Sequence, residues 1–300
     1  MKKFTSILLA GCTLLLACNK GDLFEKSQYS LETSTRMARD LVAGAPDYFG
    51  HIKSDKVTNL SQGVSLLDLS YLNKNGYAMQ LYLYKVVLGT ATLAVALPPE
   101  GEKTAPVSVQ AEALNGGTLV LGAVNGDAFS AKDKSPLGIV YRDGTGIKTT
   151  FSDDKAGFFA TLKDGTAVIG DQDDYGTYRR SLQNAIGTRG RILEGGYPVP
   201  DTQNKAEART FVAVSADGMT VWTGVVDGVY FYYSNGITLT DLATVLLAAG
   251  ASDAALLDGG NVTTLVRRDD LGEQLFPVVN SPSDNGKAYD TANALAIIEN

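Results

Sequence analysis

Asp258 is the residue whose type and setting point most directly to chemistry. It ends a short apolar run over residues 254–257, and Gly259, Gly260 and Asn261 come directly after it. A carboxylate at a strand end can act as a nucleophile or base, and two glycines let a ligand approach backbone N–H groups closely. Spacing alone favours a simpler interpretation, a hairpin loop with a solvated carboxylate. Asp258 is therefore a candidate catalytic residue with a structural turn as the alternative.

A helix is expected shortly before this turn, over residues 239–249. Thr238 is a suitable N-cap, Asp241 follows three residues later, apolar residues recur at helical spacing, and Gly250 supplies the stop. Residues 254–257 and 262–266 have the composition of strands on either side of the acidic turn. Helix, strand and turn would form one compact unit that places the carboxylate at a strand end.

A second polar corner follows a strand expected over residues 119–124. Asn125, Gly126 and Asp127 end that strand, and Asn125 carries both a hydrogen-bond donor and an acceptor. These residues could face Asp258, and by spacing alone they could equally form an ordinary Asn-Gly turn.

Arg209 and a third polar corner complete the candidates. The guanidinium of Arg209 matches a phosphate bidentately, and its ordinary alternative is a surface ion pair with Glu207. Asn280, Pro282 and Asp284 stand together near the end of the chain, where a rigid turn is the structural interpretation. None of these residues indicates a site without the others.

Four segments of the chain resemble, in order, motifs of the phosphodiester glycosidase family. They include AVNGDAF, ARTFVAV and the closing VVNSPSDNGKAYDTANAL, and they lie at residues 123–129, 208–214, 236–264 and 278–295. The resemblance extends over about residues 105 to 298. It favours a functional site at the acidic turn over a plain hairpin.

The resemblance implies roles for these polar residues. Asp258 would supply the catalytic carboxylate, with Asp127 and Asp284 as candidate partners. The implied substrate contacts are Asn125, Gly126, Arg209, Thr210, Gly259, Gly260, Asn261, Thr263 and Asn280.

The implied activity is hydrolysis of a sugar-1-phosphodiester, for example an N-acetylglucosamine-1-phosphodiester, in a cell-surface or host glycan. A phosphate leaving group departs as a stabilised anion, so the reaction needs less acid assistance than cleavage of an ordinary glycoside. One carboxylate and an arginine clamp would suffice. Retention or inversion would follow from the separation of the carboxylates.

Three positions depart from the family pattern and motivate a different function. Asn261 replaces a glycine, Val262 replaces a serine, and Tyr289 stands near an expected arginine. An aromatic ring at 289 could stack on a sugar face. The alternative is a lipid-anchored glycan-binding protein with the same fold and no turnover, and a structural role in the envelope is a third hypothesis.

The N-terminus has the pattern of a bacterial lipoprotein leader. Lys2 and Lys3 precede an apolar run that is too short to span a membrane, so residues 1–17 are expected to be a signal peptide. The Leu-Leu-Ala before Cys18 resembles a lipobox, and Cys12 follows a second candidate box. Lipidation at Cys18 would make this an outer-membrane lipoprotein, periplasmic or surface-exposed, attached to the membrane through its lipid.

Composition excludes several classes of protein. A formal charge of −7 and a pI near 4.8 argue against nucleic-acid binding, which needs clustered cations. The single histidine, His51, argues against a His-based metal cluster or triad. Asp171, Asp173 and Asp174 imitate a calcium loop, which fails because later ligand positions are apolar or aromatic. We expect no cofactor, and the sequence leaves a structural divalent cation and the oligomeric state open.

The remaining pattern predicts an α+β fold. Residues 18–60 are expected to form a tether and helical lead-in, with a short helix over 31–42, and residues 61–300 the main domain. An acidic loop and a helix over 178–186 are expected, and Asp-Gly turns between 137 and 169 indicate antiparallel hairpins. Further strands are expected over 80–88, 91–97, 119–124, 211–214, 220–226 and 229–233. The domain would contain a twisted, largely antiparallel or mixed sheet with a few packed helices.

Overall fold

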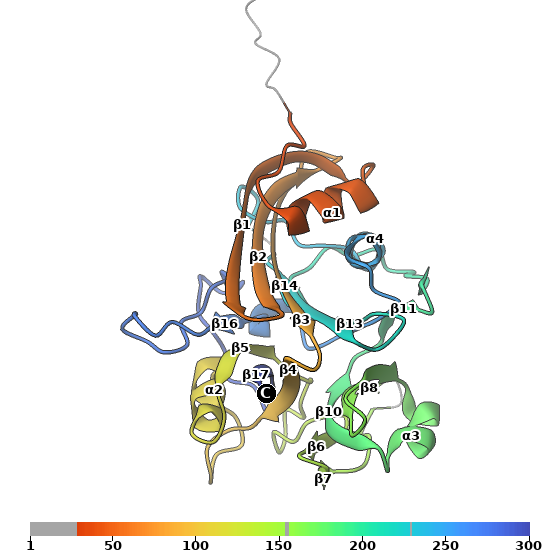
Figure 1. The fold of residues 1–300 in the computed structure, drawn as a ribbon, viewed down its shortest axis with the longest axis vertical. Helices are drawn as coiled ribbons and strands as arrows, with labels where there is room; N and C mark the ends of the chain where they lie inside the picture. Colours follow the sequence, from red (N-terminus) through yellow and green to blue (C-terminus); the bar gives the residue numbers. More distant parts are fainter. Residues whose placement is uncertain (1–28, 154–155, 229) are drawn as a thin grey trace, which may run out of the picture.

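The computed structural model describes residues 29–153, 156–228 and 230–300. Within these ranges the chain forms three antiparallel sheets and four α-helices (Figure 1). This is the predicted α+β architecture, with the strands divided among three sheets. The expected signal peptide and Cys18 lie outside the described residues. No helix in the described ranges has the length and apolar character that a membrane crossing requires.

The largest sheet has eight strands in the order β1-β2-β3-β14-β13-β15-β11-β12. Its strands are β1 (Phe49–Ser61), β2 (Val64–Asn73), β3 (Ala78–Val87), β14 (Thr220–Val226), β13 (Arg209–Val214), β15 (Asp253–Leu256), β11 (Arg191–Glu194) and β12 (Tyr197–Pro198). Strand β1 pairs with β2 along its length, so the sheet begins inside the segment expected to be a tether and helical lead-in.

Two smaller sheets cover one face of the large sheet. The five-stranded sheet contains β7 (Thr145–Lys148), β6 (Val140–Arg142), β10 (Leu182–Thr188), β8 (Gly157–Leu162) and β9 (Ala167–Gly170). The four-stranded sheet contains β16 (Leu265–Arg267), β5 (Val120–Asn125), β17 (Ala294–Glu299) and β4 (Ala91–Ala96). The β6–β7 and β8–β9 hairpins confirm the predicted Asp-Gly turns.

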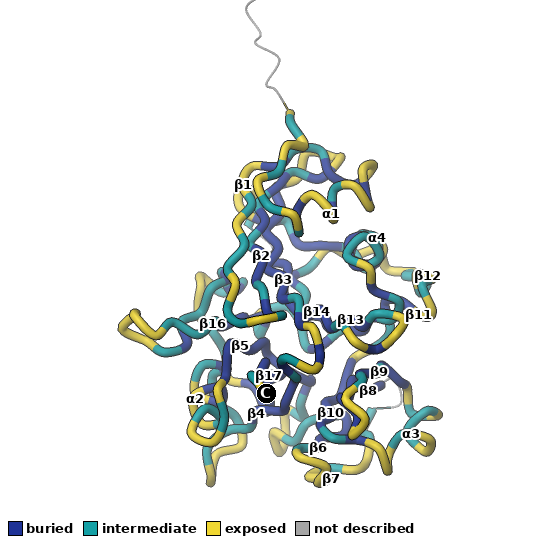
Figure 2. Tube along the Cα trace, in the orientation of Figure 1, coloured by how far each residue is buried: buried dark blue, intermediate teal, exposed yellow. Residues whose placement is uncertain are grey.

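Four helices lie on the outer faces of these sheets. They are α1 (Arg36–Gly44), α2 (Val107–Asn115), α3 (Gln172–Tyr178) and α4 (Leu239–Ala249). Helices α1 and α4 cover the large sheet, α2 packs on the four-stranded sheet, and the aromatic residues of α3 pack on the five-stranded sheet (Figure 1). Figure 2 shows buried residues concentrated in the strands between these layers.

Strand β13 shows how the large sheet can be buried on both faces. Phe211 and Ala213 belong to the core beneath α1 and α4, whereas Val212 and Val214 belong to the core shared with the smaller sheets. Successive side chains of a strand point to opposite faces, so an unbroken apolar run fills two cores at once. The strand is thereby held rigidly where its first residue, Arg209, reaches the candidate site.

Helix α4 confirms the prediction for residues 239–249. The hydroxyl of Thr238 accepts a hydrogen bond from the backbone N–H of Asp241, and Gly250 ends the helix in the left-handed region at φ 100°. Leu242, Val245 and Leu246 are buried against the large sheet. Removing the cap would cost about 1 kcal/mol. The helix and β15 together fix the position of the acidic turn.

The predicted helix over residues 178–186 is wrong. Helix α3 ends at Tyr178, and Leu182–Thr188 form strand β10, which pairs with β6 and β8. Pairing on both sides overrides the local helical preference of this segment. The expected acidic loop is also corrected, because Asp171 caps α3 and forms a capping box with Asp174.

Three other elements differ from their predicted bounds. Tyr230 and Ser234 close a tight turn, so the described part of 229–233 is not a strand. Gly260–Val262 form a 3₁₀ turn and the following strand begins only at Leu265, because the chain must first bend away from β15. The helix expected over 31–42 starts later, at Arg36, where the Thr35 hydroxyl caps it.

Candidate active site

The backbone of Asp258 is held from two sides. Its N–H donates to the carbonyl of Gly126 at 2.9 Å, and the side-chain amide of Asn125 donates to its carbonyl at 2.7 Å. These bonds join the end of β15 in the large sheet to the end of β5 in the four-stranded sheet. The second polar corner and the acidic turn therefore meet in space, as the sequence predicts. Because its backbone is held on both sides, the Cα from which the Asp258 side chain extends is fixed in position.

The Asp258 carboxylate is half-buried and lines a cavity of about 720 Å³, which we call the arginine cavity. Burial raises the pKa of this carboxyl, while the charge of Arg189 and a hydrogen bond from the Gly259 N–H lower it. A partly desolvated carboxylate is poorly hydrated, which favours its use as a nucleophile or base once it is ionised, and the nearby cation favours the ionised form.

Arg189 is a cavity residue that the sequence analysis did not predict. It lies on the wall of the arginine cavity directly after β10. Its backbone N–H donates to the Leu256 carbonyl at 2.8 Å, and the Leu256 N–H donates to the Gly190 carbonyl at 2.9 Å, so the end of β10 is tied to β15, the strand that leads to Asp258. A helix over 178–186, as predicted, would not bring Arg189 to this position. The need for a local cation in a chain of charge −7 was the available signal.

Arg209 reaches the same cavity from the start of β13. One nitrogen pairs with Glu207 at 3.0 Å, another donates to the Lys205 carbonyl at 3.0 Å, and its buried Nε has no partner in the described residues. Burial lowers the pKa of Arg209, and Glu207 opposes that effect. The structure thus contains both the expected cavity position and the alternative ion pair.

The glycine turn forms part of the cavity wall. Gly259, Gly260 and Asn261 line it, and Gly260 adopts φ 70° while its N–H donates to the Ala208 carbonyl at 2.9 Å. A side chain at Gly260 would be strained by this left-handed backbone. Thr263 follows the turn but is fully buried, its hydroxyl has no partner in the described residues, and it does not line the cavity.

Asn125 is fully buried and works as a brace. Its Oδ1 accepts from the Thr210 hydroxyl at 2.7 Å and from the Thr264 N–H at 3.0 Å, while its amide holds Asp258. Thr210 is buried as well, and neither residue lines the arginine cavity. The predicted substrate contacts of Asn125, Gly126 and Thr210 stay predictions; the observed geometry makes them supports of the acidic turn.

Asp127 lies behind the site and is 1% exposed. Its Oδ2 accepts from the Gly138 N–H at 2.5 Å, and its Oδ1 has no partner in the described ranges. Burial raises the pKa of Asp127 to about 6, and the nearby Asp258 charge contributes in the same direction. A Cβ at Gly187 would lie 2.2 Å from Oδ2, so this glycine provides the space for the carboxyl. A catalytic role for Asp127 stays a prediction.

The residues of the third polar corner, Asn280 and Asp284, form hydrogen bonds outside the arginine cavity. Asn280 is buried, and its amide donates to Asp227 at 2.7 Å while its oxygen accepts from the Leu265 N–H at 2.8 Å. Asp284 accepts from the hydroxyl of Tyr289. Neither Asn280 nor Asp284 lines the arginine cavity, although Ser283 between them does. Their predicted catalytic and binding roles stay predictions.

Asp227 is a second buried carboxyl that the sequence did not single out. It is 1% exposed and accepts from Asn280, from the Ser281 N–H at 2.9 Å and from the Tyr233 hydroxyl at 3.0 Å. Burial raises the pKa of Asp227 to about 6 despite these bonds. Its partners hold the closing loop against the end of β14, which is a structural task.

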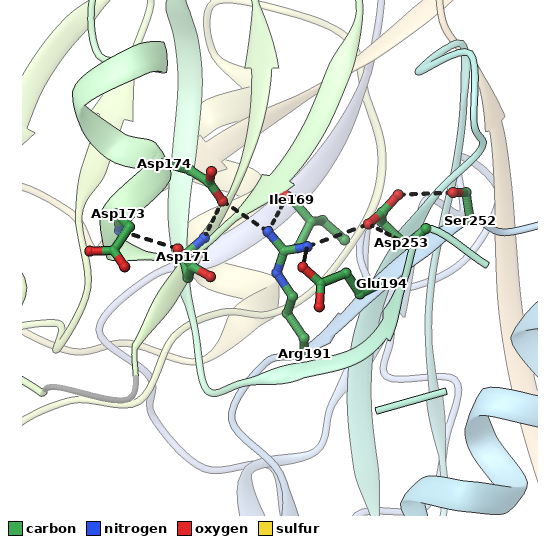
Figure 3. A network of polar contacts seen from close by, with 9 residues as sticks. Ile169, Asp171, Asp173, Asp174, Arg191, Glu194, Ser252 and Asp253 are labelled. Atoms are coloured by element: carbon green, nitrogen blue, oxygen red, sulfur yellow. Dashed lines mark hydrogen bonds and ion pairs between the residues drawn. The ribbon is translucent and has the colours of Figure 1, made fainter. Parts of the chain in front are cut away.

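Arg191 also lines the arginine cavity, but its charge is already balanced. Figure 3 shows its guanidinium between Asp174 at 2.9 Å, Glu194 at 3.2 Å and Asp253 at 3.5 Å. It also donates to the Ile169 carbonyl at 3.2 Å. These partners come from α3, β11, β15 and β9, so Arg191 clamps the large sheet to the five-stranded sheet. Arg209 has one carboxylate partner, Glu207, where Arg191 has three, and Arg189 is exposed, so Arg189 and Arg209 are the arginines better placed for a ligand.

The cavity is lined by three carboxylates, Asp201, Glu207 and Asp258, and by four cations, Arg189, Arg191, Lys205 and Arg209. Among the carboxylates, Asp258 stands at the glycine turn with Arg189 nearby. This class of site suits an anionic ester whose charge the arginines balance while the carboxylate attacks or activates water. Residues 118–298 match the model of the phosphodiester glycosidase family. The chain belongs to that family, as its motifs predict.

Solved structures support the fold. The catalytic domain of zebrafish N-acetylglucosamine-1-phosphodiester alpha-N-acetylglucosaminidase, auto-inhibited by its pro-peptide, matches with a TM-score of 0.62 and 19% identity, over 82% of this chain and 88% of that one. A hypothetical protein from Synechocystis matches with a TM-score of 0.57 and 14% identity, over 82% and 64%. A putative exported protein from Burkholderia pseudomallei matches at 0.56 and 14%, over 74% of each chain. None of the curated proteins matches this chain.

Proposed function

We propose that this protein hydrolyses the bond between an anomeric carbon and a phosphodiester. The observation that carries the proposal is Asp258, half-buried in the arginine cavity beside Arg189 and Arg209. In the reaction the C1–O bond breaks, water supplies the new hydroxyl at C1, and the phosphate leaves as a monoester. Membership of the phosphodiester glycosidase family supports this reaction class.

In this proposal the two arginines balance the charge of the phosphate, and Asp258 takes part in the attack on C1. The two arginines hold the phosphate oxygens and stabilise the charge that collects on them as the C1–O bond lengthens. Asp258 attacks C1 or removes a proton from the attacking water, and in either role it must be ionised. A phosphate monoester is a good leaving group, so the reaction needs little help from an acid.

The substrate in this proposal is a sugar-1-phosphodiester of a cell-surface or host glycan, of which N-acetylglucosamine-1-phosphodiester is one example. The zebrafish protein with the similar fold is named for that chemistry, which supports the choice of example. A lipid at Cys18 would hold the domain at the outer membrane, periplasmic or surface-exposed, close to such glycans.

The test is a turnover assay with a panel of sugar-1-phosphodiesters that differ in the sugar and share a methyl aglycone. Free sugar and methyl phosphate should appear in equal amounts, and the reaction in ¹⁸O water should label the sugar and not the phosphate. Label in the phosphate would show cleavage of the P–O bond instead. Absence of turnover across the panel by folded protein would overturn the enzymatic function.

A glycan-binding protein without turnover is the second candidate. Arg209 is already paired with Glu207 inside the cavity, and the hydroxyl of Tyr289 is bonded to Asp284. Both pairings reduce the groups that are free to stabilise a transition state. Calorimetry with the same phosphodiesters separates the candidates, because saturable binding without product favours the binding protein.

A further inference from the structure

A second cavity of about 550 Å³ lies beside the arginine cavity, and we call it the amide cavity. It is formed by the turn between β2 and β3, a segment after β12, and the chain that leads into α4. The side chains that define it are Asn73, Asn75, Tyr77, Asn204, Asn235 and Thr240. Side-chain amides and hydroxyls thus surround it, with one aromatic ring at its edge.

The charge of this lining differs from that of the arginine cavity. Asp241 is the single charged residue among the lining residues, and no lysine or arginine is present there. A phosphate or carboxylate group would find no cation to balance it. Amide groups and hydroxyls instead match a ligand with many hydroxyl groups and no charge, and an aromatic ring offers its face to an apolar sugar face.

Several of these groups are available to a ligand. Tyr77 is 51% exposed, and the side chains of Asn75, Tyr77 and Asn204 have no hydrogen bond to other described residues. The turn itself is fixed, because the Asn73 side chain accepts from the N–H groups of Asn75 and Tyr77, each at 3.0 Å. The fixed backbone of this turn leaves only the side-chain rotamers of Asn75 and Tyr77 to be ordered when a ligand binds there.

A single stretch of chain, residues 203–207, separates the two cavities. Gln203, Lys205 and Glu207 line the arginine cavity, whereas the alternate residues Asn204 and Ala206 line the amide cavity. Successive side chains of this stretch therefore line opposite cavities, with Asn204 in the left-handed region at φ 46°. The wall between the cavities is therefore one backbone thick.

At the start of α4, neighbouring residues again line different cavities. Leu239 lines the arginine cavity, and its neighbours Thr238 and Thr240 line the amide cavity. A ligand bound through a charged group at Arg209 would reach the amides by extending past this stretch of chain.

We propose that the amide cavity binds a neutral sugar residue, and that in the proposed reaction this sugar belongs to the aglycone beyond the phosphate. The sugar binding needs no turnover, and only its assignment to the aglycone rests on the proposed function. Tyr77 stacks on the sugar, and the side chains of Asn75 and Asn204 bond its hydroxyls.

The direct test uses phosphate-free neutral oligosaccharides of mannose, glucose and N-acetylglucosamine with the full-length protein. Saturation-transfer NMR and calorimetry should show saturable binding to at least one of them. Tyr77→Ala should weaken that binding about fivefold or more, and Tyr77→Phe should retain it, because the ring face is kept. Tyr29→Ala is the matched control, since Tyr29 is an exposed tyrosine that lines neither cavity.

Two results would overturn the proposal. One is absence of binding of every neutral oligosaccharide by folded protein. The other is binding that survives Tyr77→Ala and Asn204→Ala unchanged but is lost in Asp258→Asn, because the sugar would then occupy the arginine cavity. Asn204 is suited to this test because it is exposed and outside the helices and strands.

A kinetic measurement tests the assignment to the aglycone. Tyr77→Ala should raise KM about fivefold for a phosphodiester with a disaccharide aglycone and leave KM unchanged for the methyl aglycone. Equal effects on both substrates would contradict the assignment. A wild-type protein that binds neutral sugars and turns over neither substrate would refute the proposed reaction while leaving the sugar site established.

Discussion

The side-chain amide of Asn125 donates to the backbone carbonyl of Asp258 at 2.7 Å, across 133 residues of sequence. The same side chain also accepts from Thr210 and Thr264, so one buried residue joins three segments at the candidate site. Asp258 thus owes its position to a hydrogen-bond network and not to the turn alone. The orientation of the carboxylate should be sensitive to changes that never touch the substrate.

Asn125→Ala should therefore lower stability and activity together. It leaves the Thr210 hydroxyl, the Thr264 N–H and the Asp258 carbonyl without their partner, at a cost of about 3 kcal/mol. Urea unfolding should show the loss as a lower midpoint. Asn261→Ala is the matched comparison, because Asn261 is exposed in the cavity. That variant should leave the midpoint unchanged, and an equal loss in both variants would contradict the bracing role.

Asp258→Asn should abolish turnover without unfolding the protein. The substitution keeps the size of the side chain and removes a charge that burial disfavours, so the melting temperature should stay the same or rise. A fall in kcat of several hundredfold corresponds to about 3 to 4 kcal/mol of transition-state stabilisation. Asp47→Asn, at an exposed residue outside the cavity, is the control. Retention of most activity in Asp258→Asn would sink the catalytic assignment.

Arg189→Gln should move the acid limb of the pH profile of kcat/KM to higher pH. The positive charge of Arg189 lowers the pKa of Asp258, so its removal raises that pKa and delays ionisation of the carboxyl as pH increases. Arg36→Gln is the control, because the Arg36 side chain is 90% exposed and lies outside the cavity. An unshifted acid limb with reduced activity would show that Arg189 acts on the substrate alone.

Asp127→Asn should change how stability depends on pH. Folded Asp127 keeps its proton up to a pKa of about 6, above the ordinary value of 3.8, so the folded state binds more protons between about pH 4 and 6. Its contribution to stability is therefore favourable at low pH and falls as pH rises through this window. A shift of this size corresponds to about 3 kcal/mol. Asparagine does not titrate.

Urea unfolding at pH 4, 5, 6 and 7 measures this effect. The stability of Asp127→Asn relative to the wild type should increase from pH 4 to pH 6 and then level off. Asp227, whose pKa is also raised to about 6, is present in both proteins and cancels from the comparison. A difference that is constant with pH would show that Asp127 titrates at its ordinary value.

Cys18→Ser should release the protein from the membrane fraction of its native host. The substitution removes the thiol that the proposed lipid modification requires, and the first described helix, α1, begins at Arg36. Metabolic labelling with a fatty-acid analogue measures the modification, and fractionation measures the location. Cys12→Ser should change neither. Loss of label in Cys12→Ser alone would make Cys12 the lipidated residue.

The sequence by itself determined the parts of this protein that depend on neighbours a few residues apart. Thr238, Asp241 and Gly250 begin and end α4 through local hydrogen bonds, and the Asp-Gly turns form their hairpins. The run of apolar residues before Asp258 predicted a strand for the same reason. Such signals are complete within a short window, so no tertiary contact is needed to interpret them.

Only the tertiary structure decided what surrounds Asp258. Arg189 arrives through β10, whose pairing on both sides overrides a local helical preference, and Asp227 is buried because Asn280, far along the chain, folds over it. The amide cavity is separate from the arginine cavity because residues 203–207 pass between them, and its walls come from loops far apart in the sequence. Burial, pairing and cavity shape are sums over many long-range contacts, and no local spacing encodes them.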